Sequence, residues 1–111
     1  MSEKGVLLMT TVNDGAQARS LAARLIEDRL AACVQEIPIH SHYRWEGKLQ
    51  RSSEILLLVK TSTEAADAAM QSIEKNHEYE VPEIIALPIA GGLPAYLKWL
   101  VEETGGPQLS A

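Results

Sequence analysis

Residues 36–48 read Glu-Ile-Pro-Ile-His-Ser-His-Tyr-Arg-Trp-Glu-Gly-Lys, an alternation of side chains that predicts a long strand ending in a turn at Glu46-Gly47-Lys48. Pro38 confines that part of the strand to a sheet edge, because proline cannot donate a ladder hydrogen bond. At ~3.3 Å per residue the alternating stretch spans roughly 33 Å, long enough to reach a neighbouring subunit. The face expected to be buried carries Ile37, Ile39, Ser41, Tyr43 and Trp45.

A second strand follows without an intervening helix. Ile55–Val59 is apolar without alternation, which is typical of a strand covered on both faces. Thr61 and Glu64 then have the spacing of a capping box, which predicts a helix from there to about Asn76. Ile84–Leu87 is again apolar on both faces and predicts a further strand.

The N-terminal part repeats the strand-helix pattern. Val6–Val12 predicts a strand, and the helical spacing of apolar residues between Ala16 and Ala31 predicts an amphipathic helix. Asn13 or Asp14 is the expected N-cap. Pro94 suits the first turn of a final helix.

The element order is β-α-β-β-α-β with an additional C-terminal helix, which predicts an α+β, ferredoxin-like fold. We expect a single domain over residues 1–111, with its core at about 6–102 and a flexible tail at 104–111. Both main helices of this fold cover one face of the sheet. Since three of the four strands are apolar on both faces, we expect a homo-oligomer that covers the second face.

Composition excludes several classes of protein. With 46% hydrophobic and 23% charged residues the chain is typical of a globular protein. A net charge of −5 disfavours nucleic-acid binding through a broad basic face. The single cysteine, Cys33, excludes an internal disulfide. No stretch predicts a membrane span or a signal peptide, so we expect a cytoplasmic protein without a membrane partner.

Four side chains are candidate metal ligands. His40 and His42 lie two apart on one strand face, where both imidazoles could meet one Cu(II) or Zn(II) ion, although the simpler explanation is a solvated strand face, where polar residues belong. Cys33 suits Cu(I), or is simply a core residue. His77 suits a helix C-terminus, and Glu78, Glu80 and Glu83 follow it as further oxygen donors.

Aromatic residues gather in three places, and most are explained by packing between subunits. The alternative is a pocket between subunits. Its expected members are Tyr43, Trp45, Lys60, His77, Tyr79, Glu83 and Trp99.

Five ordered motifs closely resemble those of the CutA divalent-cation tolerance family. They are Leu30–Val34, Tyr43–Lys48, Leu57–Thr61, Tyr79–Ile85 and Tyr96–Trp99, and the likeness extends over Val6 to Glu102. The resemblance implies a homotrimer related in architecture to the PII signalling proteins, a cytoplasmic location, metal binding and tolerance to copper and other divalent ions. It implies no enzymatic reaction and no organic cofactor. Departures from the family pattern fall at Gln35, His40, His42 and Glu78.

The predicted function is therefore a homotrimeric divalent-metal protein, with copper as the expected ion. The alternative is a PII-like sensor whose cleft between subunits binds a small anionic metabolite or nucleotide. A third possibility is an interaction protein whose trimer is itself the functional object, with a protein partner that the sequence does not identify. A glycine-rich phosphate loop is absent, since Gly91-Gly92 lacks the required spacing and the following Lys-Ser/Thr.

Overall fold

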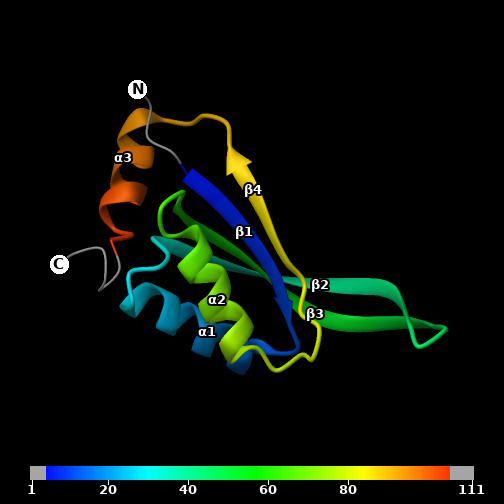
Figure 1. Cartoon of the computed structure of the whole chain (residues 1–111). Helices are drawn as coiled ribbons and strands as arrows, with labels where there is room; N and C mark the ends of the chain where they lie inside the picture. The colour runs from blue at the N-terminus through cyan, green and yellow to red at the C-terminus, as the bar shows by residue number, and fades with distance from the viewer. Residues whose placement is uncertain (1–4, 106–111) are drawn as a thin grey trace.

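The computed structural model describes residues 5–105 and contains four strands and three helices in that part of the chain. The elements are β1 (Gly5–Val12), α1 (Gly15–Glu27), β2 (Cys33–Trp45), β3 (Lys48–Ser62), α2 (Ala66–Asn76), β4 (Ile84–Ile89) and α3 (Pro94–Glu102). The strands form one antiparallel sheet in the order β2-β3-β1-β4 (Figure 1). This confirms the predicted α+β, ferredoxin-like fold with an additional C-terminal helix.

The core lies between one sheet face and the helices α1 and α2. Leu8, Val12, Leu57 and Val59 from β1 and β3 are fully buried there. They pack with the apolar stripes of the two helices, which include Leu21, Leu25, Ala69 and Ile73. None of the described helices is long and apolar enough to cross a membrane.

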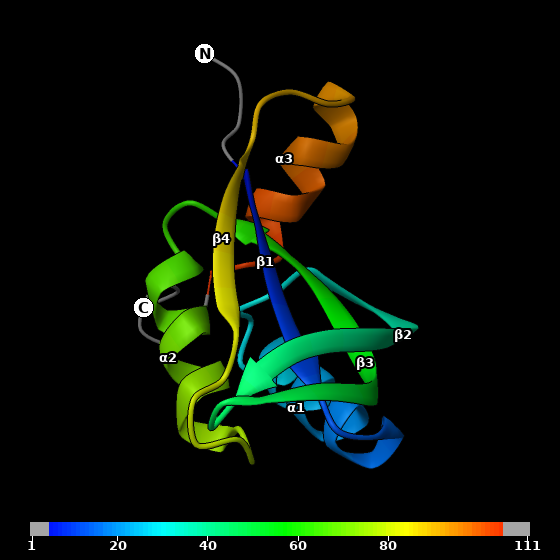
Figure 2. The ribbon, with the colours of Figure 1, turned by 90° about the vertical axis from the view of Figure 1, so that its right-hand side faces the viewer.

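The opposite sheet face, which we call the open sheet face, is not covered by α1 and α2. Figure 2 shows α2 and α3 to opposite sides of β1 and β4. Ile37, Ile85 and Leu87 are 40%, 46% and 44% exposed on the open sheet face. The strand registers place further apolar side chains beside them, namely Leu7, Met9, Cys33, Leu56 and Leu58. The single chain therefore leaves an apolar surface exposed, as the doubly apolar strands predict.

The β2–β3 hairpin extends beyond the rest of the sheet. Residues 39–54, which we call the hairpin arm, pair only with each other, from Ile39 opposite Glu54 to Trp45 opposite Lys48. The arm projects well past the ends of β1 and β4 (Figure 1). Its turn has positive φ at both Glu46 (53°) and Gly47 (80°), the backbone twist that favours a tight two-residue hairpin turn.

Two expectations about β2 and β3 were wrong. The face of β2 that was predicted to be buried is largely open, with Tyr43 and Trp45 42% and 46% exposed, because the arm stands clear of its own chain's core. The second strand is not confined to Ile55–Val59 but spans 15 residues. Its first half is polar because it pairs with β2 alone, so no apolar run marks it.

Two helix predictions also need correction. The first helix ends at Glu27 and not at Ala31, because Arg29 turns the chain with a φ of 57°. Thr61 does not cap α2. Its hydroxyl donates to the Leu30 carbonyl, and the Ser62 hydroxyl accepts from the Ala65 backbone N–H instead.

The structure also bears on the predicted N-cap of the first helix and on the predicted C-terminal tail. Asp14, and not Asn13, caps α1, with Oδ1 accepting a 2.9 Å hydrogen bond from the Gln17 backbone. Thr104, predicted to begin a flexible tail, is buried, and its hydroxyl donates to the Leu100 carbonyl. Residues 106–111 of the predicted tail lie outside the described residues.

Candidate functional site

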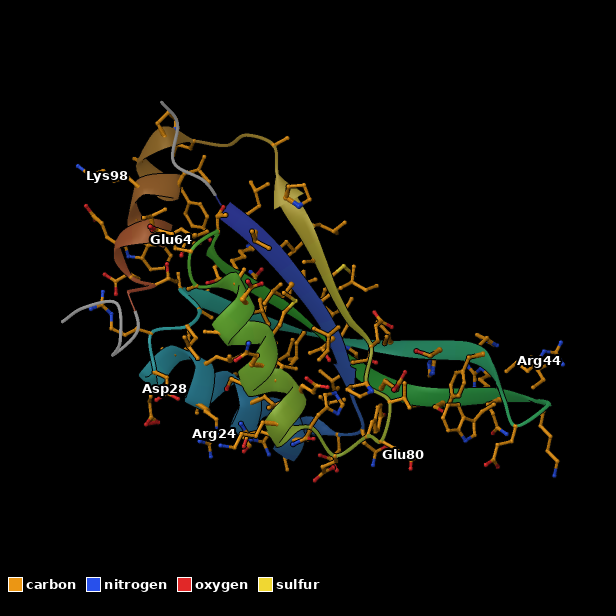
Figure 3. The ribbon with its side chains drawn as sticks, viewed as in Figure 1. Arg24, Asp28, Arg44, Glu64, Glu80 and Lys98 are labelled. Atoms are coloured by element: carbon orange, nitrogen blue, oxygen red, sulfur yellow. The ribbon has the colours of Figure 1, made fainter. Side chains whose placement is uncertain are left out.

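An open cleft of about 620 Å³ lies between the hairpin arm and the loop that leads into β4. Thr11, at the end of β1, belongs to its wall. The arm contributes Ser41, His42, Tyr43, Trp45 and Glu54. The loop contributes Glu78, Tyr79, Glu80, Val81 and Glu83. Figure 3 shows Glu80 on this loop and Arg44 near the far end of the arm.

His77 fixes the start of the loop. Its Nε2 lies 2.9 Å from the Thr11 carbonyl, which can only accept, so Nε2 carries the proton. Its Nδ1 accepts the Tyr79 backbone N–H at 3.1 Å. Both ring nitrogens of His77 are thus engaged in one neutral tautomer, which gives this side chain a structural role in the loop.

Two further contacts hold the loop in place. The backbone N–H of Glu78 donates to the side-chain carbonyl of Gln17 in α1 at 2.9 Å. The Tyr79 ring packs against His77, with the ring centroids 4.9 Å apart. The loop wall of the cleft is therefore anchored to both β1 and α1.

Glu54 and Tyr79 join the two walls of the cleft. The Tyr79 hydroxyl donates to Oε2 of Glu54 at 2.6 Å, and Glu54 is only 8% exposed. Burial, with the hydrogen bond to Glu54 and the charge of that carboxylate, holds the pKa of Tyr79 well above its usual range. Tyr79 is accordingly a hydrogen-bond donor to Glu54 at neutral pH.

The electrostatic character of the cleft is acidic. Four of its lining residues are glutamates, and none is lysine or arginine. The Tyr43 hydroxyl lies 2.8 Å from the Ser52 hydroxyl across the arm, which orients one of the aromatic walls. The single chain thus offers a cleft that combines carboxylates with exposed aromatic rings.

The predicted pocket residues divide between two ends of the sheet. Tyr43, Trp45, Tyr79 and Glu83 line the cleft, and His77 supports it from behind. Lys60 and Trp99 lie elsewhere. Lys60 Nζ is 5.9 Å from the Tyr96 ring centroid, and the Tyr96 and Trp99 rings are 5.6 Å apart, which forms a separate cluster beside α3.

The four candidate metal ligands do not converge within one chain. His42 lines the cleft, whereas Nδ1 of His40 lies 3.3 Å from the Ser53 hydroxyl at a smaller hollow. Cys33 is half-buried on the open sheet face, opposite Lys60 in the β2–β3 ladder. Within residues 5–105, no group of three or more His, Cys, Asp or Glu side chains is arranged to hold a metal ion.

Sequence reasoning missed four residues of the cleft, namely Thr11, Ser41, Glu54 and Val81. Of these, Glu54 and Thr11 are buried, and both contact the loop. A detectable signal existed for Glu54, since it is a lone acidic residue directly before the apolar run that begins at Ile55. Thr11 gave no such signal, because it holds the loop through its backbone carbonyl, which every residue has.

The chain resembles proteins of one family. The family model described as CutA1 divalent ion tolerance protein matches residues 6–103. The Divalent-cation tolerance protein CutA of Thermus thermophilus is 47% identical over 100 residues, which cover 89% of this chain and 97% of that protein. Protein CutA 1, chloroplastic, of Oryza sativa is 45% identical over 100 residues, which cover 89% of this chain. The chain spans only 56% of the length of that rice protein.

Solved structures agree with the sequence comparisons. The crystal structure of CutA1 from Oryza sativa superposes with a TM-score of 0.89 at 43% identity, over 93% of this chain and 95% of that one. The divalent cation tolerance protein from Thermus thermophilus superposes with a TM-score of 0.87 at 46% identity, over 91% and 99%. The similarity therefore covers the sheet, the arm and the helices together.

Proposed function

Because the chain belongs to the CutA1 divalent ion tolerance family, we propose that it contributes to divalent-cation tolerance as a homotrimer that binds a divalent metal ion, with copper as the preferred ion. The observation that carries this proposal is the 47% identity, over 97% of its length, to a protein named for divalent-cation tolerance. We place its action in the cytoplasm and assign it no catalysed reaction and no organic cofactor.

The open sheet face supports the homotrimer. Side chains such as Ile85 and Leu87 are nearly half exposed in the single chain, and burying them would contribute about 25 cal/mol per Å² of apolar area. The hairpin arm supplies a second reason, since it extends past its own sheet and presents Tyr43 and Trp45 to a neighbouring molecule. Light scattering should give about three times the 12.1 kDa chain mass, and a monomer at micromolar concentration would contradict the assembly.

The donor atoms available to a metal come from several parts of the chain. Imidazoles of His40 and His42 and the thiol of Cys33 suit copper, and the loop carboxylates suit harder cations. Since the described part of one chain brings no three of these donors together, we propose that a second subunit completes the coordination sphere. His77 is the weakest member of the candidate set, because both of its ring nitrogens already have hydrogen-bond partners.

The test is a calorimetric Cu(II) titration of the assembled protein, with Zn(II) as a comparison ion. A His40→Ala/His42→Ala variant should lose binding at fixed stoichiometry, whereas Arg44→Ala, a change on the same face of the arm, should retain it. Weak binding without saturation in the unsubstituted protein would contradict a direct metal role. Loss of the oligomer in the double variant would show that the two histidines act in assembly.

A sensor that binds a small molecule is the second candidate, and the size of the cleft favours it. A volume of about 620 Å³ lies within the usual range for small-molecule sites. The carboxylates that one chain contributes would repel an anionic metabolite, however. The same cleft thus favours a neutral or cationic ligand over the nucleotide that a PII-like sensor would bind.

A further inference from the structure

We propose that residues 77–79, which we call the anchor segment, form a conformational relay that couples the hairpin arm to the first turn of α1. Each of these consecutive residues is attached to a different element of the fold, namely β1, α1 and the base of the arm. A change in the order of the arm is therefore transmitted to the start of a helix. The coupling is a property of one chain and goes beyond the proposed metal role.

The first two attachments hold the anchor segment to β1 and α1. Nε2 of His77 donates to the Thr11 carbonyl at 2.9 Å, and the backbone N–H of Glu78 donates to Oε1 of Gln17 at 2.9 Å. The backbone N–H of the same Gln17 donates to Oδ1 of Asp14, the N-cap of α1. The second attachment thus reaches the residue whose backbone makes the capping bond of the helix.

The third attachment holds the anchor segment to the arm. The Tyr79 hydroxyl donates to Oε2 of Glu54 at 2.6 Å. Glu54 lies opposite Ile39 in the first residue pair of the arm, directly beyond the last residue of β3 that pairs with β1. The backbone N–H of Tyr79 donates to Nδ1 of His77 at 3.1 Å, which ties the third attachment to the first.

The three attachments depend on one another because of covalent geometry and burial. Peptide units are planar and rigid, so a backbone displacement at one residue of the anchor segment strains its two neighbours. The accepting residues Thr11, Gln17 and Glu54 are only 7%, 8% and 8% exposed, whereas the anchor segment itself is half-buried or exposed. Detachment leaves buried acceptors without their donors, which is costly. The anchor segment is therefore either attached or detached as a unit.

The arm is the input of the relay. Its strands pair only with each other, and a two-stranded ribbon is marginally stable in water, so its order depends on what contacts it. When the base of the arm frays, Tyr79 loses the fixed position of its acceptor Glu54. In the proposed homotrimer a neighbouring chain would hold the arm, so assembly would tighten the start of α1. That last step rests on the proposed homotrimer, whereas the coupling itself does not.

The first turn of α1 is the output of the relay. It lies on the helix side of the sheet, away from the open sheet face that the homotrimer would cover. Ala16 and Arg19 are exposed there. The relay thus connects a surface that assembly would bury to a surface that assembly would leave accessible.

The test is amide hydrogen exchange on the full chain in its native assembly, at one fixed protein concentration. Tyr79→Phe cuts the relay at the arm and should speed exchange of the Gln17 and Ala18 amides by about threefold or more. Tyr43→Phe, which removes a hydroxyl of the arm that does not contact the anchor segment, should change it by less than about twofold. Unchanged exchange at the two α1 amides in Tyr79→Phe would overturn the proposal. An equal acceleration at the centre of β1 would also overturn it, because that pattern indicates global destabilisation.

The reverse experiment starts from α1, since coupling between two sites is reciprocal. Gln17→Met removes the acceptor for the Glu78 backbone N–H and keeps the length of the side chain. It should speed exchange of the amides at residues 52–54 by about threefold or more. Asn13→Ala, a change beside the helix cap but outside the relay, should leave these amides within about twofold. Equal effects of the two variants on residues 52–54 would contradict the relay.

A dilution series separates this inference from the proposed homotrimer. Light scattering at the concentrations used for exchange gives the oligomeric state. If the protein is a homotrimer, dilution should speed exchange at Gln17 and Ala18, and this effect should be smaller in Tyr79→Phe. Assembly without any change at these amides would overturn the relay and leave the homotrimer intact. A monomer at every concentration would overturn only the homotrimer, because the variant comparisons at fixed concentration still decide the relay.

Discussion

The phenol hydroxyl of Tyr79 donates a 2.6 Å hydrogen bond to the carboxylate of Glu54, and this bond ties the loop before β4 to the base of the hairpin arm. The two residues are 25 positions apart in the sequence, and they come from opposite walls of the cleft. The contact holds the loop and the base of the arm together, so a substitution of either residue affects both walls of the cleft.

Removing this hydrogen bond should destabilise the protein. Tyr79→Phe leaves the buried carboxylate of Glu54 without its donor, and a bond to a charged group is worth about 1.5 kcal/mol or slightly more. We expect a lower unfolding midpoint in guanidinium chloride at one fixed protein concentration. Tyr43→Phe is the control, because the hydrogen bond between its hydroxyl and Ser52 is exposed to solvent and involves no charged group. Equal effects of the two variants would contradict the role assigned to Glu54.

The same contact predicts that the stability of the folded protein depends on pH at the alkaline end of the scale. The pKa of Tyr79 is raised in the folded protein, first by burial and then by Glu54, from its ordinary value of 10.0. A raised pKa means that the folded state keeps its proton longer than the unfolded chain. The stabilisation that protonated Tyr79 provides through its contact with Glu54 is therefore complete below about pH 10. It is lost as the pH rises above that value.

Tyrosinate absorbance measures this prediction directly. One tyrosine should titrate later than the other two in the folded protein, and that late phase should disappear in Tyr79→Phe. A late phase that persists in the variant would assign it to another residue.

The open sheet face predicts the effect of a charge on assembly. Ile85→Asp places a carboxylate among apolar side chains of that face and should shift the protein towards the monomer in light scattering. Ile26→Asp is a matched control, since Ile26 on α1 is 42% exposed against 46% for Ile85 but lies on the helix side of the sheet. Loss of the oligomer in both variants, or in neither, would contradict assembly through the open sheet face.

The cap of the first helix can be tested by a neighbouring pair of substitutions. Asp14→Ala removes the acceptor for the Gln17 backbone N–H and should cost about 1 kcal/mol of unfolding free energy. Asn13→Ala should cost much less, because the structure gives that side chain no capping bond. The comparison is made by chemical denaturation, and a larger loss in Asn13→Ala would reverse the assignment.

The contacts of Arg29 predict which part of α3 would lose protection from hydrogen exchange if this side chain were removed. Its guanidinium donates to the carbonyls of Glu102 and Glu103 and so satisfies two acceptors at the C-terminal end of the helix. Arg29→Ala should increase amide hydrogen exchange in the last turn of α3 while β1 stays protected. Unchanged exchange there would mean that packing by Leu97 and Leu100 alone holds the helix.

Most of the fold could be predicted from the sequence, because apolar residues recur at a different spacing in its strands than in its helices. The errors have local physical causes. At Arg29 a left-handed backbone ends the first helix although the apolar spacing continues to Ala31. Thr61 matched a capping pattern, but its hydroxyl is used by the Leu30 carbonyl, a tertiary contact that no local pattern contains.

The candidate site could be predicted only in part. Aromatic residues of the arm and the loop were identified because large rings in polar segments are conspicuous. Lys60 and Trp99 were predicted to share a pocket between subunits with them, and within one chain they lie in a separate cluster with Tyr96. Glu54 was missed because its importance comes from burial beneath the loop, which depends on how the chain packs rather than on its neighbours in sequence.

The isolation of the hairpin arm has a consequence for the order in which the protein folds. Strand segments 39–45 and 48–54 have only each other as ladder partners, and a free two-stranded ribbon is marginally stable in water. The sheet and its helices can form within one chain at a rate independent of protein concentration. In the proposed homotrimer the arm would become rigid only on meeting another chain. Its ordering should then be a second, slower kinetic phase whose rate rises with increasing protein concentration.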